Sequence, residues 1–229
     1  MTHSQHSILE QLDALIAERS ILQHPFYQAW TAGKLSQEQL ATYAAQYYPH
    51  VEAFPEYLRT VAAGTDDAVI RTEVLDNLRE EESEPRPHPA IWLSFAEGLG
   101  QDPQAVASAQ PTPATRKTVD AFAGLCENST AAGLTALYCY ESQQPEVAAT
   151  KAEGLKRFYG IDDDATLEYF AVHQEADVRH RAGERMAIER CLAAGTSGEE
   201  VLEAASQALD AYWGLLDGVA EATGVEMAC

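Results

Sequence analysis

Residues 169–187 read Tyr-Phe-Ala-Val-His-Gln-Glu-Ala-Asp-Val-Arg-His-Arg-Ala-Gly-Glu-Arg-Met-Ala. The stretch holds His173, Asp177 and His180, which are spaced i, i+4 and i+7. On an α-helix these three side chains lie on one stripe. Two imidazoles and a carboxylate on one stripe form a ligand set that suits iron, zinc or manganese. The alternative is a polar helix face in contact with solvent, so this stretch alone supports a metal site only as a hypothesis.

The rest of the chain also has helical period. Apolar residues recur at intervals of three and four in residues 8–16 and in most later segments, and the alternation of a strand is absent. Ser36, with Gln39 three residues later, is a capping box that predicts the start of a long helix. Pro49 and Pro55 lie inside that helix and predict kinks in it.

These segments predict one all-α domain over residues 1–229, a bundle of about seven or eight long helices.

Hydrophobic residues make up 46% of the chain, enough for a sizeable core, and the net charge of -21 disfavours binding to nucleic acid or to an anionic membrane. No apolar run is long enough to cross a bilayer, and the first residues lack the features of a signal peptide. No Cys-x-x-Cys pair is present, so reduced thiols in a cytoplasmic protein are expected for Cys126, Cys139, Cys191 and Cys229.

A carboxylate lies on an apolar face later in the chain. Glu141 is at helical spacing from Leu134 and Leu137, on a helix predicted to span residues 129–160 with a kink near Pro145. A buried carboxylate must be paired, protonated or bound to a metal ion. Pro145 cannot donate a hydrogen bond to the Glu141 carbonyl, and a distorted turn is common at functional sites. The alternative is a helix register that exposes Glu141 to solvent.

Two further candidate ligands come from an acidic helix end. Glu81 follows Leu78 on the apolar face of a predicted helix, and His88 comes seven residues after Glu81. Prolines between them prevent a continuous helix, so the spacing does not place both side chains on one face. Glu80 and Glu82 compete with Glu81 for the inward position. The alternative is an acidic helix end followed by a loop histidine.

Together the candidates are two glutamates, one aspartate and three histidines, enough to give each of two metal ions a histidine and carboxylates. This is the chemistry of the carboxylate-bridged di-iron sites found inside helical bundles. Such sites react with O2, because histidine and carboxylate ligands leave coordination positions open. Iron–iron and manganese–iron sites use the same ligand types, so the sequence leaves the metals open.

Three blocks of the chain resemble the haem-oxygenase-like di-metal oxidases, and within them the chlamydial protein associating with death domains and its bacterial relatives. The blocks are Glu81 with His88, then Leu-Tyr-Cys-Tyr-Glu-Ser-Gln-Gln-Pro-Glu from residue 137 followed by Lys151-Ala-Glu-Gly-Leu, and His173-x3-Asp177-x2-His180. The resemblance covers nearly the full length. It implies a haem-oxygenase-like (TenA/PqqC-like) fold without haem and two metal ions, Fe/Fe or Mn/Fe, held by Glu81, His88, Glu141, His173, Asp177 and His180.

The resemblance also implies a reaction. Members of this subgroup are taken to make para-aminobenzoate for folate biosynthesis in a self-sacrificing, single-turnover reaction, with O2 and an external reductant as co-substrates. The matching positions are Tyr27, whose side chain would be excised to give the ring, and Lys151, which would give the amino nitrogen. Tyr43, Tyr140 and Tyr169 would pass a radical or line the cavity. From the residues alone, a tyrosine is more often a core residue and a lysine a surface one.

The sequence supports three hypotheses unequally. The first is the self-sacrificing oxygenase, and the second is a di-metal oxygenase of the same fold that acts on a free small molecule such as an amino acid or a fatty acid. The third, a non-catalytic interaction protein or a thiamine-degrading relative, is disfavoured because it would not need six ligand-type residues at these spacings. A homodimer is the candidate assembly.

Overall fold

The computed structural model describes residues 3–83 and 86–225, with side chains from residue 7 onward. This part of the chain forms eleven α-helices and one short 3-10 helix, η1, and it contains no β-strand. The elements are α1 His3–Glu18, η1 Ile21–Gln23, α2 Pro25–Thr31, α3 Gln37–Gly64, α4 Ala68–Glu81, α5 His88–Gly98, α6 Pro103–Ala107, α7 Pro113–Asn128, α8 Thr130–Glu141, α9 Gln144–Tyr159, α10 Asp164–Ala193 and α11 Gly198–Thr223. The predicted all-α fold is confirmed.

The number of helices exceeds the predicted seven or eight. Two of them, α2 and α6, are short pieces of 7 and 5 residues. The segment predicted as one kinked helix is two helices, α8 and α9, because the chain turns at Ser142 and Gln143. Pro145 lies in the first turn of α9, where its missing N–H costs no hydrogen bond.

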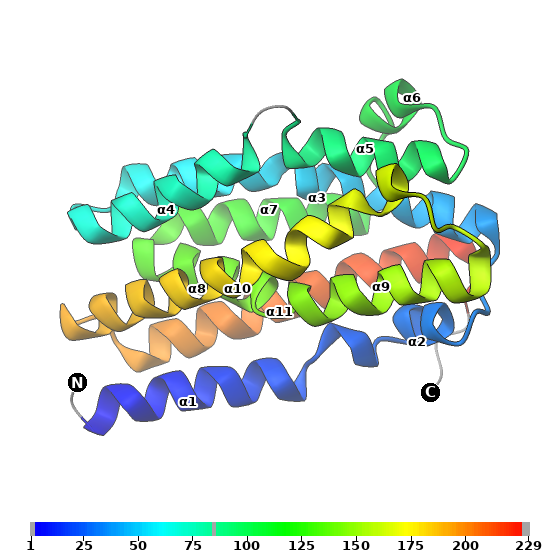
Figure 1. Cartoon of the computed structure of the whole chain (residues 1–229). Coiled ribbons are helices and arrows are strands. Elements are labelled where there is room, and N and C mark those ends of the chain that lie inside the picture. The colour runs from blue at the N-terminus through cyan, green and yellow to red at the C-terminus, as the bar shows by residue number, and fades with distance from the viewer. Residues whose placement is uncertain (1–2, 84–85, 226–229) are drawn as a thin grey trace.

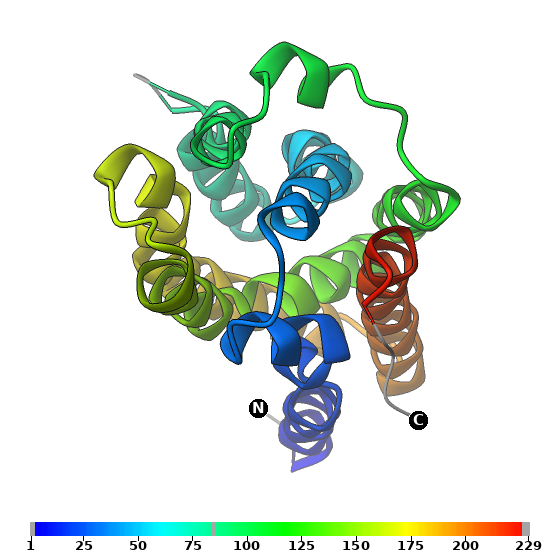
Figure 2. The same cartoon turned by 90° about the vertical axis from the view of Figure 1, so that its right-hand side faces the viewer.

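The long helices run roughly along one direction and pack around α8 (Figure 1). Every residue of α8 from Ala131 to Glu141 is buried, because the helix packs against α7, α10 and α11. Viewed along the bundle in Figure 2, α1 and α6 lie at opposite edges of the molecule. Burial on all sides explains why Glu141 is the one charged residue of α8.

Capping residues set the starts of the two longest helices. Ser36 and Gln39 form the predicted capping box of α3, and the helix continues through Pro49 and Pro55 to Gly64. Asp163 accepts a hydrogen bond from the Thr166 N–H and starts α10.

The core is rich in aromatic residues, and its largest fully buried side chains include two tryptophans and four tyrosines: Trp30, Trp92, Tyr27, Tyr43, Tyr47 and Tyr212. Cys126, Cys139 and Cys191 are buried free thiols, and Cys229 lies outside the described residues. No helix in residues 3–83 and 86–225 is both long and apolar enough to cross a membrane.

Candidate metal centre

The stripe on α10 faces the protein interior. His173 is 4% exposed, Asp177 1% and His180 7%, so the alternative of a solvent-wetted face does not hold. The 30 residues of α10 run without a break through this stripe, so the i, i+4, i+7 spacing places all three side chains on the buried side.

A first triad consists of Glu81, His88 and His173, whose candidate ligand atoms all lie within 4.8 Å of one another. Glu81 is the last residue of α4 and His88 the first of α5, so the proline-rich link brings two helix ends together. Glu81 Oε1 lies 2.8 Å from His88 Nδ1 and 3.9 Å from His173 Nε2. The Tyr169 carbonyl accepts a hydrogen bond from His173 Nδ1 at 2.7 Å, which leaves Nε2 directed at the triad with its lone pair free.

The adjacent glutamates have other partners. Glu80 is only partly buried and accepts hydrogen bonds from Arg179 at 2.6 Å and from His180 at 3.2 Å. Glu82 ends α4 as its C-cap and pairs with Arg59 on the surface. Glu81, 3% exposed, is therefore the member of this acidic run that faces the interior.

A second triad consists of Glu141, Asp177 and His180, again with its candidate ligand atoms within 4.8 Å of one another. His180 Nδ1 lies 3.1 Å from Glu141 Oε1 and 3.3 Å from Asp177 Oδ1. The Asn77 amide on α4 donates to both Glu141 oxygens, at 3.0 and 3.1 Å, and holds that carboxylate in place. Glu184, one turn after His180, packs beside Glu141.

The two triads face one shared space. A cavity of about 10 Å³ is lined by Glu81 and His173 from the first triad and by Glu141 and Asp177 from the second. The cavity is about the size that holds one water molecule. Carboxylate residues from both triads therefore line one space, as a carboxylate-bridged metal pair requires.

Burial shapes the protonation of both triads. Burial, with His88 nearby, lowers the pKa of His173 to about 3, so this imidazole is neutral at physiological pH. Burial raises the pKa of Asp177 to about 8, and the charges of Glu141 and Glu81 add to the rise. Burial alone would lower the pKa of His180, but its hydrogen bonds to Asp177 and Glu141 raise it to about 11. A proton on His180 therefore balances part of the negative charge that a bound cation would balance instead.

The donor set fits a pair of divalent metal ions. Asp177 and Glu184 are both buried; Asp177 Oδ1 has His180 Nδ1 at 3.3 Å, and the Glu184 carboxyl group contacts the Glu141 carboxylate. An uncompensated buried carboxylate is costly, and a coordinated cation removes that cost. Neutral imidazole and carboxylate together suit iron or manganese.

A second polar cluster joins Tyr27 on α2, Tyr43 on α3 and Lys151 on α9. The Tyr27 and Tyr43 hydroxyls lie 3.0 Å apart, and Lys151 Nζ donates to the Tyr43 hydroxyl at 2.5 Å. The three side chains are at most 3% exposed. Tyr27 is a core residue, as is usual for tyrosine, and Lys151 is also buried, although lysine is more often found at the surface.

An aromatic chain connects this cluster to the triads. The rings of Tyr43 and Tyr47 lie 5.2 Å apart between centroids, and the Tyr47 hydroxyl donates to that of Tyr140, 3.0 Å away. Tyr140 precedes the ligand candidate Glu141, and Tyr169 stacks on His173 with ring centroids 4.0 Å apart. Tyr140 and Tyr169 both line the cavity shared by the triads.

Comparison with known proteins shows which family the chain belongs to. Residues 41–213 match the sequence family described as iron-containing redox enzymes. The chain belongs to this family. This iron-containing redox enzyme is 43% identical to the 4-aminobenzoate synthase of Nitrosomonas europaea, over 96% of the chain and 94% of that protein. It is 39% identical to the 4-aminobenzoate synthase of Chlamydia trachomatis, over 92% of the chain and 91% of that protein.

The fold of the iron-containing redox enzyme is the haem-oxygenase-like fold of the TenA proteins. A TenA homologue from Pseudomonas syringae superimposes with a TM-score of 0.79 and covers 94% of this chain and 92% of that one, at 17% identity. The expectation of a haem-oxygenase-like helical fold is thereby confirmed.

Four buried polar residues near the site were not predicted from the sequence: Asn77, Glu184, Tyr47 and Tyr212. For three of them, helical spacing from a predicted site residue indicated a place on the same helix face. Asn77 precedes Glu81 by four residues, Glu184 follows His180 by four, and Tyr47 follows Tyr43 by four. Tyr212 gave no such signal, because its contact with the Tyr47 hydroxyl at 3.0 Å joins helices far apart in sequence.

Proposed function

We propose that this protein is an O2-dependent di-metal oxygenase that makes 4-aminobenzoate (para-aminobenzoate) from its own Tyr27 side chain, with the amino nitrogen supplied by Lys151. The relatives named 4-aminobenzoate synthase match nearly the full chain at 39–43% identity. The observation that carries the proposal is the buried contact of both residues with one hydroxyl, that of Tyr43.

The six triad residues would hold the metals, with Glu81, His88 and His173 on one ion and Glu141, Asp177 and His180 on the other. One ion would be iron and the second iron or manganese. Bound there, the metals would activate O2 with electrons from an external reductant.

The chain's own residues position the reacting groups. The hydroxyl of Tyr27 is held by Tyr43, and the ring packs edge-on against Trp30 with centroids 6.4 Å apart. Burial lowers the pKa of Lys151 well below its ordinary value, so its amine is available as a neutral nucleophile. Tyr43, Tyr47 and Tyr140 supply a continuous path of phenols along which an oxidising equivalent can pass from the triads to Tyr27.

The size of the cavities argues against the alternative of a free small-molecule substrate. Among the described residues, the space shared by the triads is about 10 Å³, too small for an amino acid or a fatty acid. A neighbouring cavity beside the second triad measures about 200 Å³, below the roughly 300–1,000 Å³ of ordinary small-molecule sites. A substrate already built into the core needs no such cavity, and it is held in position by packing.

The proposal is tested by intact mass and product analysis. Metal-loaded protein is exposed to O2 with a reductant, and we expect 4-aminobenzoate together with a defined mass loss at Tyr27. Tyr27→Phe and Lys151→Arg should each abolish the product, since the first removes the phenol and the second the primary amine. Tyr48→Phe, at a buried tyrosine of α3 that bonds Glu52 instead, is the matched control and should still form product.

Two outcomes would contradict the proposal. Repeated turnovers with an added aromatic precursor would favour the free-substrate oxygenase. Isotope-labelled lysine in the protein that leaves no label in the amino group of the product would remove Lys151 as the nitrogen donor.

A further inference from the structure

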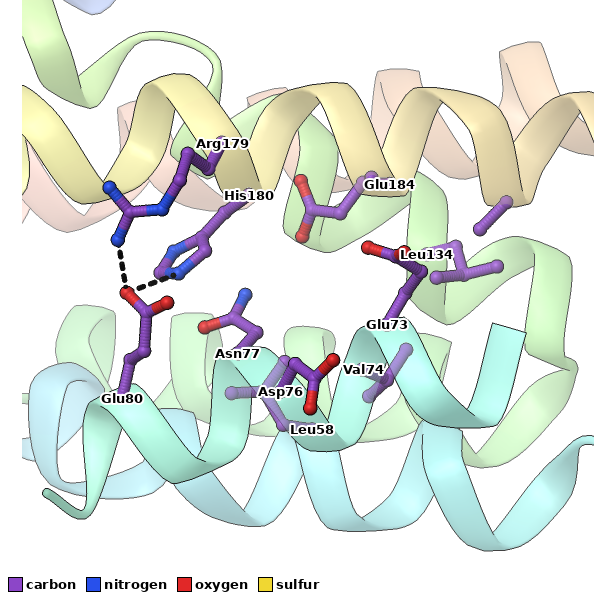
Figure 3. Close-up of a pocket in the computed structure, with 12 residues that line it drawn as sticks. Leu58, Glu73, Val74, Asp76, Asn77, Glu80, Leu134, Arg179, His180 and Glu184 are labelled. Atoms are coloured by element: carbon purple, nitrogen blue, oxygen red, sulfur yellow. Dashed lines mark hydrogen bonds and ion pairs between the residues drawn. The ribbon is translucent and has the colours of Figure 1, made fainter. Parts of the chain in front are cut away.

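A second cavity opens beside the second triad, between α4 and α10 (Figure 3). It measures about 200 Å³ and reaches His180 and Asn77, the residues that contact Glu141. Its lining consists of Leu58, Glu73, Val74, Asp76, Asn77, Glu80, Leu134, Arg179, His180, Gly183, Glu184 and Ala187. The cavity therefore connects exposed residues of α4 to the buried centre.

Glu184 is a buried carboxyl group that faces this cavity. It is 5% exposed, and no basic or amide side chain among the described residues donates a hydrogen bond to its carboxylate oxygens. Figure 3 shows its carboxylate directed from α10 into the cavity, toward α4. On its inner side Glu184 packs beside Glu141, a residue of the second triad. Two buried carboxyl groups in contact need a proton or a cation between them, so this pair is a place where a cation is stabilised.

The outer end of the cavity carries a further free carboxylate. Glu73 on α4 is exposed and forms no ion pair among the described residues, whereas Asp76 pairs with Arg79 and Glu80 with Arg179. A Cβ at Gly183 would lie 2.6 Å from Glu73 Oε2, so glycine there lets the Glu73 carboxylate lie against α10. That position is one residue before Glu184 in the chain. Two unpaired carboxylates therefore lie at the outer and inner parts of one cavity.

We propose that this cavity is the route by which a divalent metal ion enters, with Glu73 as the outer ligand and Glu184 as a transit ligand that passes the ion to Glu141. The ligand is a hydrated Fe2+ or Mn2+ ion, because each step offers carboxylate oxygen and the cavity has room for the ion's remaining waters. The acidic mouth also raises the local concentration of cations. The inference rests on the triads binding metal and is independent of which product the enzyme makes.

Metal uptake by metal-free protein tests the route directly. Anaerobic Fe2+ is mixed with the protein, and the loss of chelatable Fe2+ is followed in time by stopped-flow absorbance. We expect Glu184→Gln to slow uptake by about tenfold, which corresponds to about 1.4 kcal/mol in barrier height. We expect Glu73→Gln to slow it by about two- to threefold, because it removes one steering charge. Both substitutions conserve shape, and the change at Glu73 lies on the surface, so it leaves the core intact.

The control is Glu203→Gln. Glu203 lies on α11 and lines another acidic pocket, with Asp120 and Glu200, which shares no lining residue with the cavity between α4 and α10. It should take up Fe2+ at the wild-type rate, and all variants should reach the wild-type final occupancy.

Three results would overturn the proposal. Unchanged uptake rates in both Glu184→Gln and Glu73→Gln would show that the metal enters elsewhere. A lower final stoichiometry in Glu184→Gln would make Glu184 a resident ligand rather than a transit one. A wild-type protein that takes up no Fe2+ would refute the metal centre itself, a failure that is distinct from a failure of the route.

Discussion

Replacing Lys151 by methionine should stabilise the protein at neutral pH. The side chain is 3% exposed, and its amine donates one hydrogen bond, to the Tyr43 hydroxyl. The rings of Tyr27, Tyr47 and Phe170 surround Nζ with centroids at 4.8, 5.0 and 5.9 Å. Because burial lowers the pKa of Lys151 well below its ordinary value, folding removes a proton that the unfolded chain retains.

The sign of the pH dependence follows from this difference in proton binding. Between the folded pKa and the ordinary value of 10.5, the unfolded state binds more protons, so the wild-type free energy of unfolding rises with pH. For one proton the slope is about 1.4 kcal/mol per pH unit. Methionine fills a similar volume without the amine. The stability advantage of Lys151→Met should therefore shrink from pH 8 to pH 9, by up to about 1.4 kcal/mol.

Urea denaturation of the metal-free protein at both pH values measures this change. Lys156→Met, at an exposed lysine on the same helix, is the control and should leave the pH dependence of unfolding as in the wild type. A constant stability difference between Lys151→Met and wild type at the two pH values would refute the reasoning. It would mean that the buried amine is charged in the folded protein. The proposal that Lys151 acts as a neutral nucleophile in amino transfer would then be wrong.

Two further predictions concern the triads and the packing beside Tyr27. His88→Ala should lower the metal content measured by elemental analysis from two ions per chain to one, because only the first triad loses a ligand. Loss of both ions would show that the triads do not bind metal independently. Gly154→Ala should destabilise the protein by about 1–3 kcal/mol, since its Cβ would lie 2.7 Å from Trp30 Cδ1. Gly124→Ala on α7, which meets no atom within 4 Å, should stabilise it by about 0.5–1 kcal/mol, and similar shifts of the two melting temperatures would contradict this packing argument.

The local features of the centre could be predicted from the sequence because they depend on spacing within one helix. His173, Asp177 and His180 share a face of any α-helix that includes them. Glu141 ends a helix that is buried on all sides, so its burial follows from the apolar residues around it in the sequence. The capping box at Ser36 could be predicted for the same reason, since both of its hydrogen bonds join residues three apart.

Contacts between different helices could not be predicted from residue spacing. Spacing alone could not choose Glu81 over its acidic neighbours, because that choice depends on how α4 ends against α5 and α10. Lys151 and Tyr43 are 108 residues apart, and their contact exists only because α9 and α3 pack on either side of the aromatic core. Helical periodicity fixes which side of a helix is buried, but the partner on that side is selected by the packing of whole helices. The sequence therefore determined the inward faces and most ligand candidates, while the tertiary structure decided how they join into two triads and a buried Tyr–Lys cluster.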